Sequence, residues 1–188
     1  MDKITKVKSI SIWIFVVPFV AVNACLILIT NFHDLFPNQE HIIHNTIPYI
    51  DGGASISRTA RVFPTYLIFK PAMFLTSYLL IKYWIYNKEI INFFESNHKN
   101  IKYFVFFGIG SAIFLILHSI FLGIKFDNDF YKLFRRIVML SFILFEVIAQ
   151  TYLVATLYSI KEKLADHIKF YVLKIKLILV SILIIVAV

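Results

Sequence analysis

The stretch that decides the fold is KYFVFFGIGSAIFLILHSIFLGI, residues 102–124. Its apolar residues occupy every face of a helix, whereas a helix on the surface of a soluble protein keeps one face polar. A helix of roughly 20 apolar residues is long enough to cross the hydrocarbon core of a bilayer. We therefore predict a transmembrane helix here. Its small residues, Gly108 to Ala112, should allow a neighbouring helix to approach closely.

Four further apolar stretches of similar length flank this one, at about residues 9–30, 65–86, 137–160 and 170–188. Backbone groups in lipid must be paired internally, and these continuous runs lack the alternation of barrel strands. The prediction is an all-α, polytopic transmembrane helix bundle of about five spans, forming a single domain over residues 1–188. The last stretch spans fully only if Lys174 and Lys176 extend to the membrane surface. The apolar run ends abruptly, so a missing further C-terminal helix stays open as an alternative.

Composition supports a membrane location and argues against several functions. Hydrophobic residues make up 60% of the chain and charged residues only 16%, against about a quarter charged in an average soluble protein. The net charge of +8 comes from lysines that lie between the apolar runs and do not form one basic face. We expect no nucleic-acid binding. The sequence contains no Walker loop, dinucleotide glycine pattern or Gly-x-Ser-x-Gly motif, and we predict no cofactor.

The orientation follows from the distribution of positive charge. Twelve of the 19 Lys and Arg residues lie at the N-terminus, in or between the adjoining ends of the second and third stretches, and in or between those of the fourth and fifth. Positively charged loops stay in the cytoplasm. We predict a cell-membrane protein with a cytoplasmic N-terminus and with the 31–64 loop outside the cytoplasm. Tyr83 and Trp84, beside Lys82, are predicted to mark the cytoplasmic membrane interface.

The 31–64 loop is too long for a simple connection and carries both apolar and polar residues, so we expect it to be structured. Its segment IPYIDGGASISR, residues 47–58, combines a proline, an aspartate and two glycines that favour a tight turn. Arginine binds phosphate bidentately, which suggests a lipid headgroup site. The alternative is a tight turn whose arginines merely lie among headgroups. The candidates for headgroup binding are Tyr49, Asp51, Gly52, Gly53, Arg58 and Arg61.

The same segment carries a family resemblance. Pro48, Tyr49, Ile50 and one of the two following glycines, in a first loop after an N-terminal helix, resemble the motif of the damage-regulated autophagy modulator family. That family includes lipid-remodelling factors of glycosylphosphatidylinositol anchors. Asp51 stands where the family usually has Ser, and family members generally have six helices. The resemblance implies a lipid-related multi-pass protein.

Polar residues inside the predicted spans form a second group of candidates. A charge near the bilayer centre is costly and is seldom present without a partner or a function. Glu146 is the acidic residue deepest in a span, and Gln150 lies one helical turn further along the same face. Asn23 and His118 lie at comparable depths in two other spans. The four residues would either line a cavity open to the outer leaflet or join helices by hydrogen bonds.

Three functions remain open. The first is binding or organising membrane lipid through the outer loop and the cavity. The second is a lipid-modifying enzyme with Glu146, His118 or Asp51 as acid or base, for which no nucleophile is evident. The third is transport of a small solute or proton. The paired histidines His41 and His44 are too few for a metal centre, and we predict none. Expected partners are membrane lipids and either another membrane protein or a second copy of the chain.

Overall fold

The computed structural model describes residues 2–37, 49–50, 59–96, 98–124, 129–165 and 168–187. Within these ranges all regular secondary structure is helical and no β-strand forms, which confirms the all-α prediction. The helices are α1 (Asp2–Asn31), the short 3-10 helix η1 (His33–Leu35), α3 (Tyr66–Phe94), α4 (Ile101–Phe121), α5 (Asp129–Ser159) and α6 (Phe170–Ala187). Each of the five predicted apolar stretches therefore lies largely within one α-helix.

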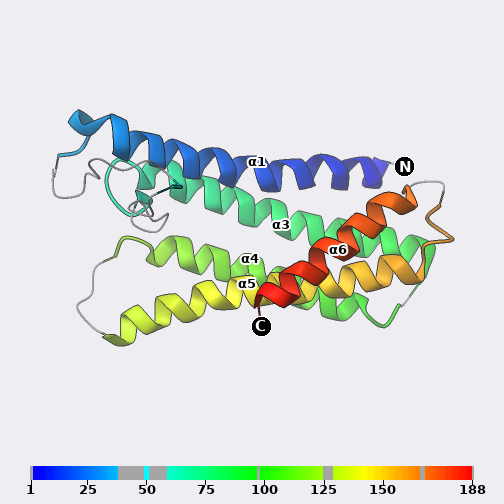
Figure 1. Ribbon diagram of the computed structural model, residues 1–188. Coiled ribbons are helices and arrows are strands. Elements are labelled where there is room, and N and C mark those ends of the chain that lie inside the picture. The colour runs from blue at the N-terminus through cyan, green and yellow to red at the C-terminus, as the bar shows by residue number, and fades with distance from the viewer. Residues whose placement is uncertain are drawn as a thin grey trace.

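Four long helices run side by side in alternating directions, as Figure 1 shows. α1 packs against α3, α3 against α4, and α4 against α5. α6 packs against α5 and crosses the bundle obliquely, so that the C-terminus lies near the middle of its length (Figure 1). We call the end that holds the N-terminus the N-terminal end. The opposite end, where α1 leads towards α3 and α4 towards α5, is called the loop end.

Three of these helices are long and apolar enough to cross a membrane, among the residues that the structure describes: Lys3–Asn31, Ile101–Phe121 and Asp129–Ser159. Only 22–33% of the most apolar window of each is buried inside the bundle. Large apolar side chains such as Phe15, Phe106 and Leu140 are instead exposed. Apolar surface on this scale is not left to water in soluble proteins. The chain therefore has the features of a multi-pass membrane protein with three candidate spans.

The helices extend beyond the apolar stretches. α3 continues to Phe94, past the predicted end at residue 86, and α5 begins at Asp129 rather than at residue 137. Hydropathy marks where a helix is apolar, but charged residues such as Lys and Glu are also good helix formers. Asp129 lies in the first turn of α5, where a negative charge is favourable, and its carboxylate bonds Lys132 at 2.9 Å.

The contact between α3 and α4 depends on Trp84 and Gly108. A Cβ added to Gly108 would lie 2.3–2.5 Å from three atoms of the Trp84 indole, so only glycine fits. The Trp84 side chain is 0% exposed and packs on Phe104. The small-residue stretch of α4 is thus a packing surface, as predicted. Tyr83 and Trp84 are both buried between helices, and their position at the cytoplasmic membrane interface stays a prediction.

Candidate functional site

Two of the predicted site residues, Tyr49 and Asn23, are hydrogen-bonded to each other at the loop end. The Tyr49 hydroxyl donates a hydrogen bond to Asn23 Oδ1 at 3.0 Å, while Asn23 Nδ2 donates to the carbonyl of Phe19 at 2.7 Å. Tyr49 has a φ of 70°, a backbone conformation that non-glycine residues rarely adopt. This strained residue is therefore held to α1 through one side-chain amide.

Arg61 lies in a segment that is hydrogen-bonded to the loop end of the bundle. The Thr65 hydroxyl donates to the carbonyls of Thr59 and Val62, and the buried Cys25 thiol of α1 contacts the Thr65 carbonyl at 3.4 Å. The Arg61 side chain is exposed. Its segment therefore presents a cation above the bundle. Asp51, Gly52, Gly53 and Arg58 lie outside the described residues, so their headgroup role stays a prediction.

Gly123 is a residue of this end that sequence reasoning did not select. It follows α4 with a φ of +89°, and a Cβ added to it would lie 2.9 Å from the Arg61 carbonyl oxygen. Glycine is therefore needed both for the backbone conformation and for the close approach. A single glycine after an apolar run is a common helix-end signal. Its packing partner, however, is visible only in three dimensions.

His118 and Arg135 form the most unusual part of the loop end. His118 lies in the last turn of α4, and Arg135, on α5, is close enough to act on it electrostatically. His118 Nδ1 and Arg135 Nε are both buried and have no hydrogen-bond partner among the residues that the structure describes. A buried polar atom without a partner costs about 1–3 kcal/mol. A ligand group with hydrogen-bonding oxygens is one way to satisfy two such atoms on neighbouring helices.

Two further groups at the loop end bind main-chain carbonyls that follow His118. Tyr131 donates to the Phe121 carbonyl at 2.8 Å, and the Arg135 guanidinium lies 6.0 Å from the Tyr131 ring centroid. Lys70 of α3 reaches the Ile120 carbonyl at 3.4 Å. Cations from α3, α5 and the Arg61 segment thus gather around the end of α4.

Glu146 belongs to a different part of the bundle. Its Oε2 accepts a hydrogen bond from Ser111 of α4 at 2.7 Å, and its Oε1 accepts one from Gln150 at 2.9 Å. Eleven residues separate Glu146 from Arg135, which corresponds to roughly 16 Å along α5. In the described structure the four intramembrane candidates are therefore found in three places: Asn23 with Tyr49, His118 with Arg135, and Glu146 with Gln150. Ser111 is the partner that sequence reasoning missed.

Lys176 is a second residue that the structure brings near Glu146. Its amino group donates to the Tyr83 hydroxyl of α3 at 2.9 Å and acts electrostatically on Glu146. Lys174 is exposed, whereas Lys176 is only partly exposed. Lys176 therefore bonds a residue of another helix, to which the oblique path of α6 brings it. That both lysines extend to the membrane surface, the condition for a full fifth span, stays a prediction.

Comparison with family models, curated proteins and solved structures found no match. The resemblance to the damage-regulated autophagy modulator family stays a prediction, and of its motif residues only Tyr49 and Ile50 fall in the described part of the chain. No group of three His, Cys, Asp or Glu side chains that could hold a metal ion occurs among the described residues. His41 and His44 lie outside them.

Proposed function

We propose that this protein spans the cell membrane with five helices and binds the anionic headgroup of a membrane lipid at its loop end. The N-terminus lies in the cytoplasm and the loop end faces the opposite side. α3 and α6 complete the bundle, and lipid acyl chains cover its exposed apolar surface. The exposed side chains on α1, α4 and α5 support this arrangement.

The observation that carries the proposal is the pair of unpartnered buried nitrogens, His118 Nδ1 and Arg135 Nε. Lipid phosphate oxygens would accept a charge-assisted hydrogen bond from the guanidinium and a second bond from the imidazole. Lys70, which reaches the Ile120 carbonyl, and Arg61, whose backbone lies beside Gly123, add positive charge at this end of α4. An apolar ligand would leave both nitrogens unsatisfied.

The distribution of arginine adds independent support. Every arginine of the chain lies in the loop or at the start of α5, at positions 58, 61, 135 and 136, whereas the N-terminal end carries only lysines. The preference of positively charged residues for cytoplasmic loops does not distinguish lysine from arginine. Arginine differs in its planar fork of donors, which matches phosphate geometry. The loop from Tyr49 to Arg58 would complete the headgroup site, as its sequence predicts.

An enzymatic function has one observation in its favour. Ser111 donates to Glu146, which is the geometry of a hydroxyl nucleophile next to its base. However, the Ser111 side chain is 0% exposed and also donates to the Gly108 carbonyl at 2.8 Å. A substrate could not reach it without separating α4 from α5. Glu146 and Ser111 are therefore better explained as a hydrogen-bonded link between the two helices.

The test compares Arg135→Gln with Arg136→Gln, because Arg136 is the neighbouring, exposed arginine and the two variants lose the same charge. Each protein is reconstituted in nanodiscs, and lipid retained around it is quantified by mass spectrometry with phosphatidylglycerol and phosphatidylcholine in competition. We expect Arg135→Gln to lower the preference for phosphatidylglycerol about tenfold, as the loss of a charged hydrogen bond predicts, and Arg136→Gln to change it less than threefold. Equal effects of the two variants would refute the headgroup site.

The orientation is tested separately by thiol labelling of intact cells. Cysteine at position 55 should react with a membrane-impermeant reagent, and Lys99→Cys should react only after lysis. The reverse pattern would invert the topology and place the arginines in the cytoplasm.

A further inference from the structure

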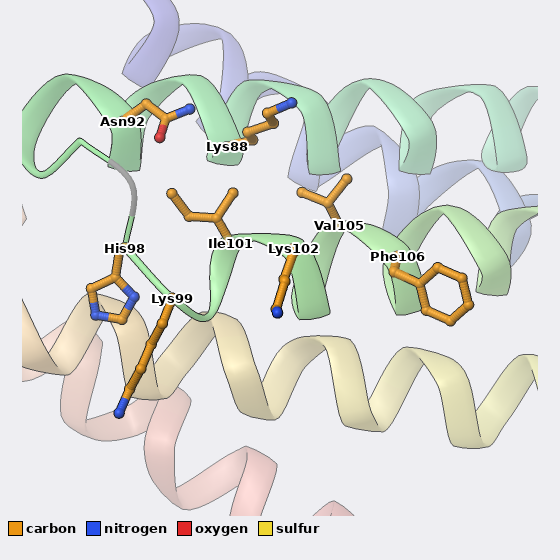
Figure 2. Close-up of a pocket in the computed structure, with 8 residues that line it drawn as sticks. All are labelled: Lys88, Asn92, His98, Lys99, Ile101, Lys102, Val105 and Phe106. Carbon is orange, nitrogen blue, oxygen red and sulfur yellow. The ribbon is translucent and has the colours of Figure 1, made fainter.

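A cavity of about 530 Å³ opens at the N-terminal end of the bundle, between α3 and α4. It is lined by Lys88, Asn92, His98, Lys99, Ile101, Lys102, Val105 and Phe106. Figure 2 shows that these residues come from the last turns of α3, the connection after it and the first turns of α4. The lining therefore combines three lysines with apolar side chains, and it includes no carboxylate.

Among the described residues, other cations engage the carboxylates nearest to the three lysines, and the Lys102 amino group lies 4.9 Å from the Tyr103 ring centroid. Glu89 pairs with Lys3 at 2.8 Å, and Glu95 pairs with Lys163 at 2.9 Å. Lys88, Lys99 and Lys102 make no ion pair among the described residues. The cavity thus holds unneutralised positive charge, although two carboxylates lie within seven residues of Lys88 in the sequence.

The start of α4 strengthens the attraction for an anion. Its N-cap residue, Asn100, makes no side-chain capping bond, and the N–H groups of Ile101, Tyr103 and Phe104 donate to backbone carbonyls. The positive end of the helix dipole still favours a negatively charged ligand. The 21-residue helix begins here, with Lys99 just before it and Lys102 in its first turn.

His98 fixes the connection that bears Lys99. Its Nδ1 accepts a hydrogen bond from the Asn100 backbone N–H at 3.3 Å, so its Nε2 carries the proton and donates to Ser159 Oγ of α5 at 3.1 Å. His98 is therefore a positioning residue that holds the cavity wall to α5. The lysine amino groups are not held in this way, and in Figure 2 they point in different directions on their flexible stems.

The cavity changes from charged to apolar along the bundle axis. Val105 and Phe106 follow Lys102 by about one helical turn, so they lie roughly 5–6 Å deeper. The Phe106 side chain is 66% exposed, and Ile101 and Val105 extend towards α3 in Figure 2. A ligand that fills this space needs an anionic group at the end of the bundle and a hydrocarbon part beside the helices.

We propose that this cavity binds the phosphate headgroup of an anionic phospholipid, with Lys88, Lys99 and Lys102 turning towards the phosphate and Phe106 contacting the acyl chain. In the orientation proposed above, this lipid belongs to the cytoplasmic leaflet. The site is separate from the loop end and does not depend on the headgroup site there.

The test measures binding of dioctanoyl phosphatidic acid, dioctanoyl phosphatidylcholine and inorganic phosphate to the full-length protein in a non-ionic detergent. In one variant the three lysines of the cavity become Gln. In the matched control, Lys161, Lys169 and Lys174 become Gln, which removes the same charge from the same end on the α5–α6 side. We expect the cavity variant to weaken phosphatidic acid binding tenfold or more, by roughly the contribution of several lysines to an anionic lipid, and the control variant to weaken it less than threefold.

Each other outcome overturns part or all of the proposal. Equal losses in the two triple variants would show that only the overall charge matters. Phosphate binding as tight as phosphatidic acid binding would identify a soluble anion as the ligand, and Phe106→Ala, which should weaken only lipid binding, checks this point. Equal binding of phosphatidylcholine and phosphatidic acid would remove the anionic headgroup. If the cavity variant does not fold, Lys102→Gln is compared with Lys102→Arg, and equal affinities would refute the site.

Discussion

Replacing Gly108 with alanine tests the packing on which the bundle depends. The added methyl group would lie 2.3, 2.4 and 2.5 Å from three indole atoms of Trp84, whereas carbon atoms in contact prefer about 3.5–4.0 Å. The indole or the helix must therefore move by about 1 Å. Trp84 has no free space for this movement, because it is 0% exposed and packs against Tyr83 at 5.1 Å between ring centroids.

The magnitude follows from two opposing effects. Adding a methyl group to a well-packed core costs about 1–3 kcal/mol, and replacing glycine by alanine in a helix restores up to about 1 kcal/mol. We therefore expect Gly108→Ala to lower the free energy of unfolding by about 1–2 kcal/mol. Gly110→Ala is the comparison, because its methyl group would lie 2.6 and 2.8 Å from two ring atoms of Phe145. Phe145 packs against other rings but is partly exposed, whereas Trp84 is fully buried, so this variant should cost less than Gly108→Ala.

The measurement is unfolding in mixed micelles by SDS titration, followed by circular dichroism. The chain has two tryptophans, Trp13 and Trp84, so a Trp13→Phe background makes the fluorescence report on Trp84 alone. Gly108→Ala should shift this emission as well as the unfolding midpoint. If Gly108→Ala is as stable as Gly110→Ala and leaves the emission unchanged, the close α3–α4 contact described here is incorrect.

Two further predictions concern carboxylates in different surroundings. Glu146→Gln keeps an oxygen that accepts from one of the two donors, so it should change the free energy of unfolding by less than about 0.5 kcal/mol. Glu146→Leu leaves Gln150 without its acceptor and should lower the free energy of unfolding by about 1 kcal/mol. A selective loss of lipid binding in the Gln variant would instead give Glu146 a functional role. At the N-terminal end of the bundle, the hydrogen bond from Lys163 holds the pKa of the Glu95 carboxyl below its usual range. Because this pKa is lowered by folding, the stabilisation is complete above the unfolded pKa of about 4.3 and disappears as the pH falls through the folded pKa. The thermal midpoint of the wild type should therefore fall more steeply than that of Lys163→Gln between about pH 5 and pH 3, and parallel curves would exclude the linkage.

The sequence was sufficient for the helices because their signal is local. A run such as residues 102–124 is apolar on every face, and no neighbouring segment is needed to recognise it as a helix. The same holds for the packing surface of α4, where four small residues within five positions leave room for a neighbour. Which neighbour fills the room is not local information. Trp84 was read as an interfacial residue because it lies beside Lys82, and only the fold shows that it points at Gly108.

The candidate site was predicted less well, because depth along a helix does not define direction around it. Asn23, His118 and Glu146 lie at broadly comparable predicted depths, which suggested one cavity. In the structure Asn23 bonds Tyr49 and Glu146 bonds Ser111. The tilt of α6 could not be predicted from the sequence either. Lys174 and Lys176 lie in the same apolar run, and only the structure shows that Lys176 bonds the Tyr83 hydroxyl.

The two ends of the bundle differ in how their cations are paired. This difference distinguishes cations that only stabilise or orient the protein from cations that bind a ligand. At the N-terminal end, Lys3 and Lys163 pair with Glu89 and Glu95, while the cavity lysines make no ion pair in the described part of the chain. At the loop end, Arg135 has a buried nitrogen that none of the described residues satisfies. If positive charge served only to orient the chain in the membrane, solvent-exposed lysines would suffice at both ends. A guanidinium nitrogen buried without a partner is destabilising unless a ligand completes it, so lipid phosphate should raise the stability of the wild type more than that of Arg135→Gln.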